Sequence, residues 1–311
     1  IDTAGNISSA STVALTVENT APTITGTTVA ADNTTIAVTF SEAVFDTTGG
    51  SGALEVGDFS LTISGGTATI NAAPSSISIS DNVYTLGLNL SGTPDGSEIV
   101  TVVPSSATAI YDAVANAAST SQSNNTVSLN DEAVPTNQNT VFANAISKKG
   151  GATVTIVSSA TASNDVWFAP ASTTSFSAGA TMTKAASGTA TSIAAPANAG
   201  TYYLYVIDTA GNISSASTVA LTVDSTAPTA TLAYTKDGTT ATSVKEGDVV
   251  LVTATFNEAI AVSPVMQISA SGVTTIAATD MTQTDATHYY YNWTVGTGDG
   301  TQTFALATGT D

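Results

Sequence analysis

The sequence predicts an all-β protein, built as an elongated string of antiparallel β-sandwiches. Three observations support this prediction: short runs with a period of two, no segment with helical periodicity, and repeats that divide the chain into units of roughly a hundred residues. Apolar residues alternate with polar or small ones in runs such as Ile36, Val38, Phe40 and Tyr289, Tyr291, Trp293, Val295. Gly, Asn, Asp or Ser bounds each run, as is typical of half-buried strands that end in turns.

Three copies of an acidic, proline-containing segment indicate the domain boundaries. They read ENTAPT at 18–23, DEAVPT at 131–136 and DSTAPT at 224–229. Proline cannot continue a central strand, so we interpret these segments as linkers. We therefore expect sandwiches at 18–130, 131–223 and 224–311, preceded by a short piece at 1–17.

A second repeat marks the last turn of each unit. DTAGN stands at 2–6 and 208–212, and DAVAN stands at 112–116; Asp, Gly and Asn are turn residues. The whole of IDTAGNISSASTVALTV at 1–17 returns letter for letter at 207–223. We interpret 1–17 as the last hairpin of a preceding domain, and 224–311 as a domain that lacks its final strand. Either the chain is a window through a tandem array, or the strand at 11–17 completes an open domain of a neighbouring subunit by strand addition.

The composition argues against several classes of function. The net charge of −19 argues against binding to nucleic acid or to anionic membranes. Without Cys and with one His, the chain cannot build the usual zinc, iron–sulfur or cysteine-dependent sites. His288 stands in the opposite phase to the apolar residues of its strand, so we expect it to face outward. No apolar run is long enough to span a bilayer, and no catalytic constellation is present, so we expect a protein that is not an enzyme.

Acidic residues are predicted to gather at one pole of each sandwich. The first strand runs from the linker to the far pole of the sandwich, and the second strand runs back. The loop after the second strand and the last turn should therefore lie at the same pole as the linker. The predicted groups are Glu18, Glu42, Asp112 and Asn116; Asp131, Glu132, Asp208 and Asn212, with Asp165 in place of the missing Glu; and Asp224, Glu258 and Asp311. Clustered carboxylates repel one another, and Ca²⁺ accepts six to eight oxygen ligands in flexible geometry. We therefore expect Ca²⁺ to stiffen each junction; alternatively, these acids are solvated and only bond to their own turns.

The motifs together resemble a known family. D-x-AGN before a last strand, a linker [DE]-x-TAPT and a strand ending in Phe-x-Glu, at 40–42 and 256–258, resemble the bacterial Ig-like domains of large surface adhesins. Similar modules occur in surface-layer proteins, and residues 18–130 also resemble the long sandwich repeats of cyanobacterial swimming-associated surface proteins. The resemblance implies tandem Ig-like domains, an extracellular location at the cell surface, and a spacer role. The middle domain departs from the pattern because it has no Phe-x-Glu.

Three functions follow as expectations. The first is a structural segment of a surface fibre or adhesin stalk, and the second is a subunit of a surface-layer lattice or strand-exchanged filament, with copies of the same protein as partners. The third is a glycan-binding module, in which Trp167, Tyr203, Tyr205 and Tyr290 stack on sugars. Core or cross-strand packing is the alternative role for these aromatic residues.

Overall fold

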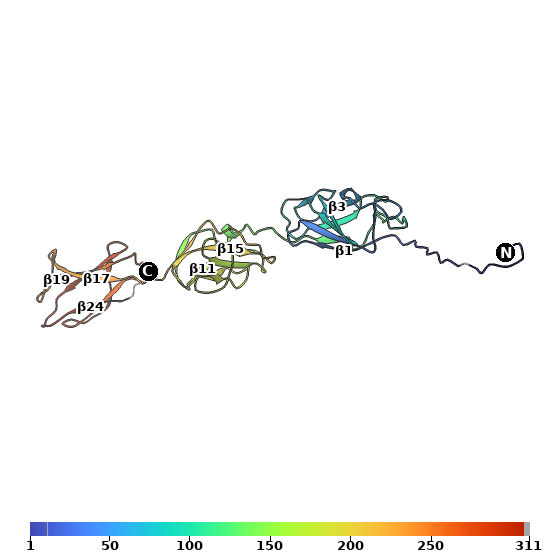
Figure 1. The fold of residues 1–311 in the computed structure, drawn as a ribbon. Helices are drawn as coiled ribbons and strands as arrows, with labels where there is room; N and C mark the ends of the chain where they lie inside the picture. Colours follow the sequence, from blue (N-terminus) through green and yellow to red (C-terminus); the bar gives the residue numbers. More distant parts are fainter. Residues whose placement is uncertain (11, 308–311) are drawn as a thin grey trace. The chain divides into compact units, whose positions relative to one another are not determined.

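The computed structural model describes residues 1–10 and 12–307, and its fold is all-β, as predicted (Figure 1). The described residues fall into two compact units. The first contains residues 1–146, 153–195 and 201–221; the second contains residues 147–152, 196–200 and 222 onward. Every sheet ladder whose register is known is antiparallel, so the prediction of antiparallel sheets is confirmed.

Residues 24–128 form a first sandwich of two main sheets. One sheet has the order β1-β2-β6-β5, with β1 (Ile24–Val29), β2 (Thr35–Phe40), β6 (Val83–Gly87) and β5 (Ile77–Ser80). The other has the order β3-β8-β9, with β3 (Phe59–Ser64), β8 (Ile99–Pro104) and β9 (Thr126–Ser128). A 3-10 turn at Val56–Asp58 precedes β3. A separate short pair joins β4 (Thr69–Ile70) to β7 (Leu90–Ser91). Phe40, Phe59 and Tyr84 meet between the two sheets, with the Phe40 and Tyr84 rings edge to face at 5.5 Å. The alternation that predicted these strands thus points the larger residues into one shared core.

A second set of strands follows a one-turn helix, α1 (Gln138–Val141). Its larger sheet has the order β10-β16-β15-β12-β13, with β10 (Ile146–Lys149), β16 (Leu221–Asp224), β15 (Gly200–Ile207), β12 (Asp165–Ala169) and β13 (Thr183–Lys184). Opposite it, β11 (Thr153–Thr155) pairs with β14 (Ser192–Ala194). The buried Phe168 ring of β12 packs edge to face on Phe142 at 5.0 Å. Residues 207–223 therefore contain the last strand of a folded sheet, as the sequence predicted.

A third sandwich repeats the plan of the first. One sheet has the order β18-β17-β19-β23-β22, with β18 (Thr239–Thr240), β17 (Ala230–Lys236), β19 (Val249–Phe256), β23 (His288–Thr294) and β22 (Thr282–Gln283). The other has the order β21-β20-β24, with β21 (Ile276–Asp280), β20 (Gln267–Ser271) and β24 (Thr303–Ala307). The central order β17-β19-β23 matches β1-β2-β6. Within the described residues, β24 is an edge strand.

Residues 1–17 differ from their copy at 207–223. Figure 1 draws this segment without a strand, and every described residue in it is exposed. The turn at 2–6 forms, but no strand follows it among the described residues, because an isolated strand is not stable alone. That 1–17 is the last hairpin of a preceding domain stays a prediction. The domain boundaries at 18, 131 and 224 and the elongated string stay predictions.

Candidate metal centre

Three turns with the pattern Asp-x-x-x-Asn have the same hydrogen bonds. Asp112 Oδ1 accepts the backbone N–H of Val114 at 2.9 Å and of Asn116 at 2.8 Å, and Asp112 Oδ2 accepts the Asn116 amide at 2.7 Å. Asp208 and Asp2 make the same three bonds at 2.7–3.0 Å to residues two and four positions later. The residue before each Asn has a positive φ, at Gly5 (+90°), Ala115 (+76°) and Gly211 (+94°). The predicted turn is confirmed in all three copies.

The linker acid bonds to the turn of the sandwich that follows it. The Asn116 amide donates to Glu18 Oε2 at 2.7 Å, and the Asn212 amide donates to the backbone oxygen of Asp131 at 3.1 Å. The backbone N–H of Thr20 also donates to Glu18. The sequence-based argument that a linker acid finds its partners in the next domain therefore holds for Glu18. In the second linker only the backbone oxygen of Asp131 does so, because Glu132 Oε1 accepts the amide of Asn33 in the preceding sandwich.

Equivalent hydrogen bonds fix the loop after the second strand in the first and third sandwiches. The backbone N–H of Thr23 donates to Ser41 Oγ at 3.0 Å, and that of Thr229 donates to Asn257 Oδ1 at 2.7 Å. Because Ser41 and Asn257 are the middle residues of the two Phe-x-Glu motifs, the following glutamates, Glu42 and Glu258, take equivalent places.

In the first sandwich, the structure brings three acids together. One carboxylate oxygen each of Glu18, Glu42 and Asp112 lies within 4.8 Å of the others, with Asp112 buried and Glu42 half-buried. Among the described residues, this is the one group of three or more His, Cys, Asp or Glu side chains with that spacing. Oxygens bound to one Ca²⁺ at about 2.3–2.6 Å lie no more than about 5 Å apart, so the spacing suits that ion.

The electrostatics of this cluster differ between its members. Burial raises the pKa of the Glu42 carboxyl above its ordinary value, and the charges of Asp112 and Glu18 raise it further. Burial alone would also raise the pKa of Asp112, but hydrogen bonds from the Asn116 side chain and backbone hold it below its ordinary value. Glu42 is therefore the member whose charge is least compensated by protein groups.

Asn116 does not present an oxygen to this cluster. Its amide nitrogen donates to both Glu18 and Asp112. As a direct ligand of a cation, Asn116 would have to turn its amide over, so the three carboxylates are the better candidates.

The acids predicted for the middle sandwich do not assemble into one group. Asp165 forms an ion pair with Lys184 at 2.7 Å, and Glu132 Oε1 accepts the Asn33 amide at 3.1 Å. Asp208 bonds within its own turn, and Asp131 Oδ1 accepts the backbone N–H of Ala133 at 2.9 Å. The predicted grouping of Asp165 and Glu132 with Asp208 is wrong, because Lys184 already neutralises Asp165 and Asn33 holds Glu132.

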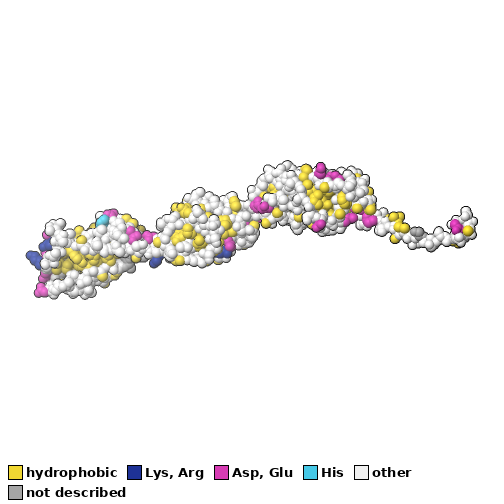
Figure 2. Space-filling view, viewed as in Figure 1, with side chains coloured by type: hydrophobic (Ala, Val, Ile, Leu, Met, Phe, Trp, Pro, Cys, Tyr) yellow, Lys and Arg dark blue, Asp and Glu magenta, His cyan; other side chains and the backbone are white. Residues whose placement is uncertain are grey.

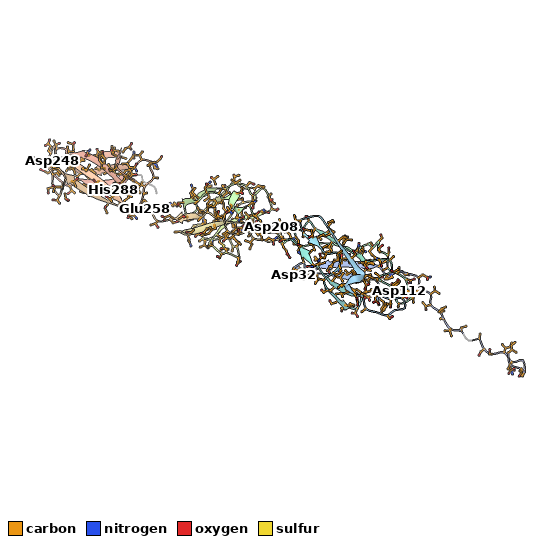
Figure 3. The ribbon with its side chains drawn as sticks, turned by 90° about the horizontal axis from the view of Figure 1, so that it is seen from above. Asp32, Asp112, Asp208, Asp248, Glu258 and His288 are labelled. Atoms are coloured by element: carbon orange, nitrogen blue, oxygen red, sulfur yellow. The ribbon has the colours of Figure 1, made fainter. Side chains whose placement is uncertain are left out.

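The third sandwich contains part of the predicted group. Asp224 Oδ1 accepts the backbone N–H of Thr226 at 2.9 Å. One carboxylate oxygen of Glu258 is buried and has no hydrogen-bond partner in the described part of the chain. Asp311 lies outside the described residues. Figure 3 labels Asp112, Asp208 and Glu258, one from each sandwich.

Three other side chains considered from the sequence, those of His288, Trp167 and Tyr205, have structural contacts with their neighbours. The side chain of His288 is 43% exposed, and its Nδ1 lies 2.9 Å from Asp285 Oδ1. Hydrogen bonds from the Thr287 N–H and from His288 lower the pKa of Asp285 to about 2. Trp167 and Tyr205 are buried and pack on Phe176, with ring centroids at 5.7 and 5.2 Å. For these two aromatic residues, core packing is the role that the structure supports.

Sequence reasoning missed one buried carboxylate. Glu98 is fully buried; its Oε1 accepts the backbone N–H groups of Thr67 and Ala68, and its Oε2 accepts that of Asp95. Burial alone would raise its pKa, but these N–H donors hold the pKa below its ordinary value. The period of two was the available signal, because Glu98 shares its phase with the buried Val100 and Val102.

Comparisons with known proteins give weak likenesses. No protein-family model and no curated protein matches the chain. The N-terminal part of the bacterial S-layer protein SbsC is 18% identical with a TM-score of 0.28, over 76% of this chain and 41% of that structure. A chicken TCR is 11% identical with a TM-score of 0.19, over 52% of this chain and 86% of that one. Bacteroides ovatus SGBP-B, in complex with a mixed-linkage heptasaccharide, is 13% identical with a TM-score of 0.18, over 83% of this chain and 73% of that one. The fold assignment therefore depends on the strand order and the buried cores.

No helix among the described residues is long and apolar enough to cross a membrane.

Proposed function

We propose that this segment is a non-enzymatic spacer of an extracellular cell-surface fibre or adhesin stalk, in which Ca²⁺ fixes the linker to the first sandwich. The observation that carries this proposal is the Glu18, Glu42 and Asp112 cluster. Its members come from the linker, the loop after β2 and the last turn, which are three separate parts of the chain. A divalent cation held by all three would tie the linker to the sandwich that it enters.

The charge balance of the cluster supports a cation there. Three carboxylates within 4.8 Å repel one another. Burial raises the pKa of Glu42 most, and the charges of Asp112 and Glu18 raise it further. Bound Ca²⁺ would supply positive charge between the three oxygens, and water or backbone carbonyls would complete its shell. Without the ion, repulsion favours separation of Glu18 from the other two acids and thus a freer linker.

The surface is consistent with a spacer. Acidic side chains appear singly or in small groups on the face shown in Figure 2, amid mostly uncharged polar atoms. The net charge of −19 keeps such chains apart in solution. Extracellular modules bind Ca²⁺ with dissociation constants of about 10⁻⁴–10⁻³ M, so millimolar Ca²⁺ outside a cell suffices.

The experiment compares thermal unfolding of the full chain in Ca²⁺ and in excess chelator, with calorimetric titration of CaCl₂. At ten to a hundred times the dissociation constant, a bound ion adds about 1–3 kcal/mol to the free energy of unfolding. Glu42→Gln should lose this Ca²⁺ effect. In chelator, the same variant should be at least as stable as the parent, because it removes a carboxylate whose charge is disfavoured.

Asp81→Asn is the matched control, because it also removes one carboxylate and lies in the turn between β5 and β6, away from the cluster. Its response to Ca²⁺ should equal that of the parent. Equal Ca²⁺ stabilisation of the parent and of Glu42→Gln, or no calcium binding by either, would exclude a calcium site at this cluster.

A further inference from the structure

The amide of Asn116 joins the last turn of the first sandwich to the linker. Its nitrogen donates to Asp112 Oδ2, within the turn, and to Glu18 Oε2, 98 residues earlier in the chain, both at 2.7 Å. A primary amide has two N–H groups, so one is used within the turn and the other on the linker. Ionised carboxylates only accept hydrogen bonds, so these two partners also fix which end of the amide faces them.

Asn212 makes the corresponding pair of bonds in the middle set of strands. Its amide nitrogen lies 3.0 Å from Asp208 Oδ2, within the turn, and 3.1 Å from the backbone oxygen of Asp131, 81 residues earlier. The linker group differs, because Asn116 binds a side chain whereas Asn212 binds the main chain. In both copies, however, the second N–H group of the turn asparagine is bonded to the first residue of the linker.

Both turns hold their asparagine in place without help from the linker. The aspartate that opens each turn accepts the backbone N–H groups two and four residues later. The turn at 2–6 closes with the same bonds although all of its residues are exposed, so this geometry is local. A group that is already ordered loses little entropy when it binds, so the asparagine is well suited to hold the linker.

The acid at the start of each linker also orders its own segment. Glu18 accepts the backbone N–H of Thr20, and Asp131 Oδ1 accepts that of Ala133 at 2.9 Å. The atoms to which the two asparagines bind therefore lie on ordered stretches of chain. All of these bonds join protein groups directly.

We propose that Asn116 and Asn212 are latches, each of which holds a linker on the sandwich that it enters by direct hydrogen bonds and without a bound ion. In the first sandwich, the latch acts together with Ca²⁺, because Glu18 also belongs to the acidic cluster. In the middle set of strands it acts alone, since Lys184 neutralises Asp165. This inference goes beyond the calcium proposal and does not depend on it, because both linkers stay attached in chelator.

The test is limited digestion of the full chain by a glutamyl endopeptidase in excess chelator, with the products separated by mass spectrometry. This protease takes the glutamate before the cut bond into its specificity pocket, so the Glu18 side chain must leave Asn116 before cutting. It also cuts after Glu132, next to the carbonyl that Asn212 binds. Asn116→Ala should raise the cutting rate after Glu18 at least about threefold, as expected for one lost hydrogen bond, and leave the rate after Glu132 unchanged. Asn212→Ala should do the reverse.

Two controls separate a latch from general loosening. Glu55 is exposed in the first sandwich, so the cutting rate after it should be equal in the parent and in Asn116→Ala. Asn6→Ala removes the same bond from the turn at 2–6, where the Asn6 amide donates to Asp2 of its own turn, and it should leave all three rates unchanged. Circular dichroism checks that each variant is folded.

Cutting after Glu18 at the parent rate in Asn116→Ala would overturn the proposal. Rates that rise equally after Glu18, Glu55 and Glu132 would also overturn it, because they would show a general loosening of the fold. Either result would leave the calcium proposal standing, since the digestion is run without free Ca²⁺ and Asn116→Ala keeps the three carboxylates of the cluster.

Discussion

The same seventeen residues, at 1–17 and 207–223, take two different states. In both copies the Asp–Asn turn closes with equivalent hydrogen bonds, but only the second copy continues into a strand, β16. The turn is local, because the Asp side chain binds its own backbone. The strand is not local, since its backbone groups and apolar side chains need a neighbouring edge and core.

The energies of the two states explain this difference. Burial of Leu221 and Val223 stabilises the strand by about 1.5–3 kcal/mol each, which offsets much of the entropy lost when those residues are ordered. Leu15 and Val17 have no such burial in the described structure, so nothing compensates for ordering them.

The largest expected effect comes from placing the same charge at equivalent positions of the two copies, in two separate variants. Leu221→Asp buries an unpaired carboxylate and should cost at least about 4 kcal/mol, enough to unfold the middle sandwich. Leu15→Asp should leave the unfolding free energy of the chain unchanged, because Leu15 is exposed. Urea unfolding followed by circular dichroism measures both, and similar losses in the two variants would contradict the different environments of the copies.

A carboxylate that holds a distant segment should matter more than one that holds its own turn. Glu98 binds backbone thirty residues away, so Glu98→Gln should cost about 1–3 kcal/mol, whereas Asp2→Asn should cost nothing globally. The folded pKa of Glu98 is below the ordinary 4.5, so its stabilisation is present above that pH and is lost as the pH falls through the folded value. Urea unfolding below about pH 4.5 should show less acid sensitivity in Glu98→Gln, and an unchanged slope would contradict this role.

The smallest effects concern the left-handed residue of the three turns. Gly211→Ala should cost about 1 kcal/mol from backbone strain alone, because no atom lies within 4 Å of the added Cβ, and Ala115→Gly should gain about 0.5–1 kcal/mol. Gly5→Ala should not change global stability. Thermal unfolding distinguishes the three; a loss with Ala115→Gly would mean that the turn is not strained there.

Local sequence patterns predicted the strands and the turns. They could not fully predict the candidate site, because its members come together through pairing between distant parts of the chain. Alternation placed Ile36, Val38 and Phe40 in a core, and the shared pole of linker, second loop and last turn correctly brought Glu18 to Asp112. The same reasoning failed where a partner came from an unforeseen register. Lys184 lies beside Trp167 across the β12–β13 ladder and thereby reaches Asp165, and no local pattern reveals that pairing.

The most direct test of the central claim, that a partner edge decides whether this sequence becomes a strand, is amide hydrogen exchange on the full chain in dilute solution. In dilute solution, the amides of Leu15 and Val17 should exchange at the rate of an unfolded peptide, while those of Leu221 and Val223 are protected. Equal protection of both copies would contradict the claim, because the first copy would then form its strand without the neighbouring strand that β16 has in β15.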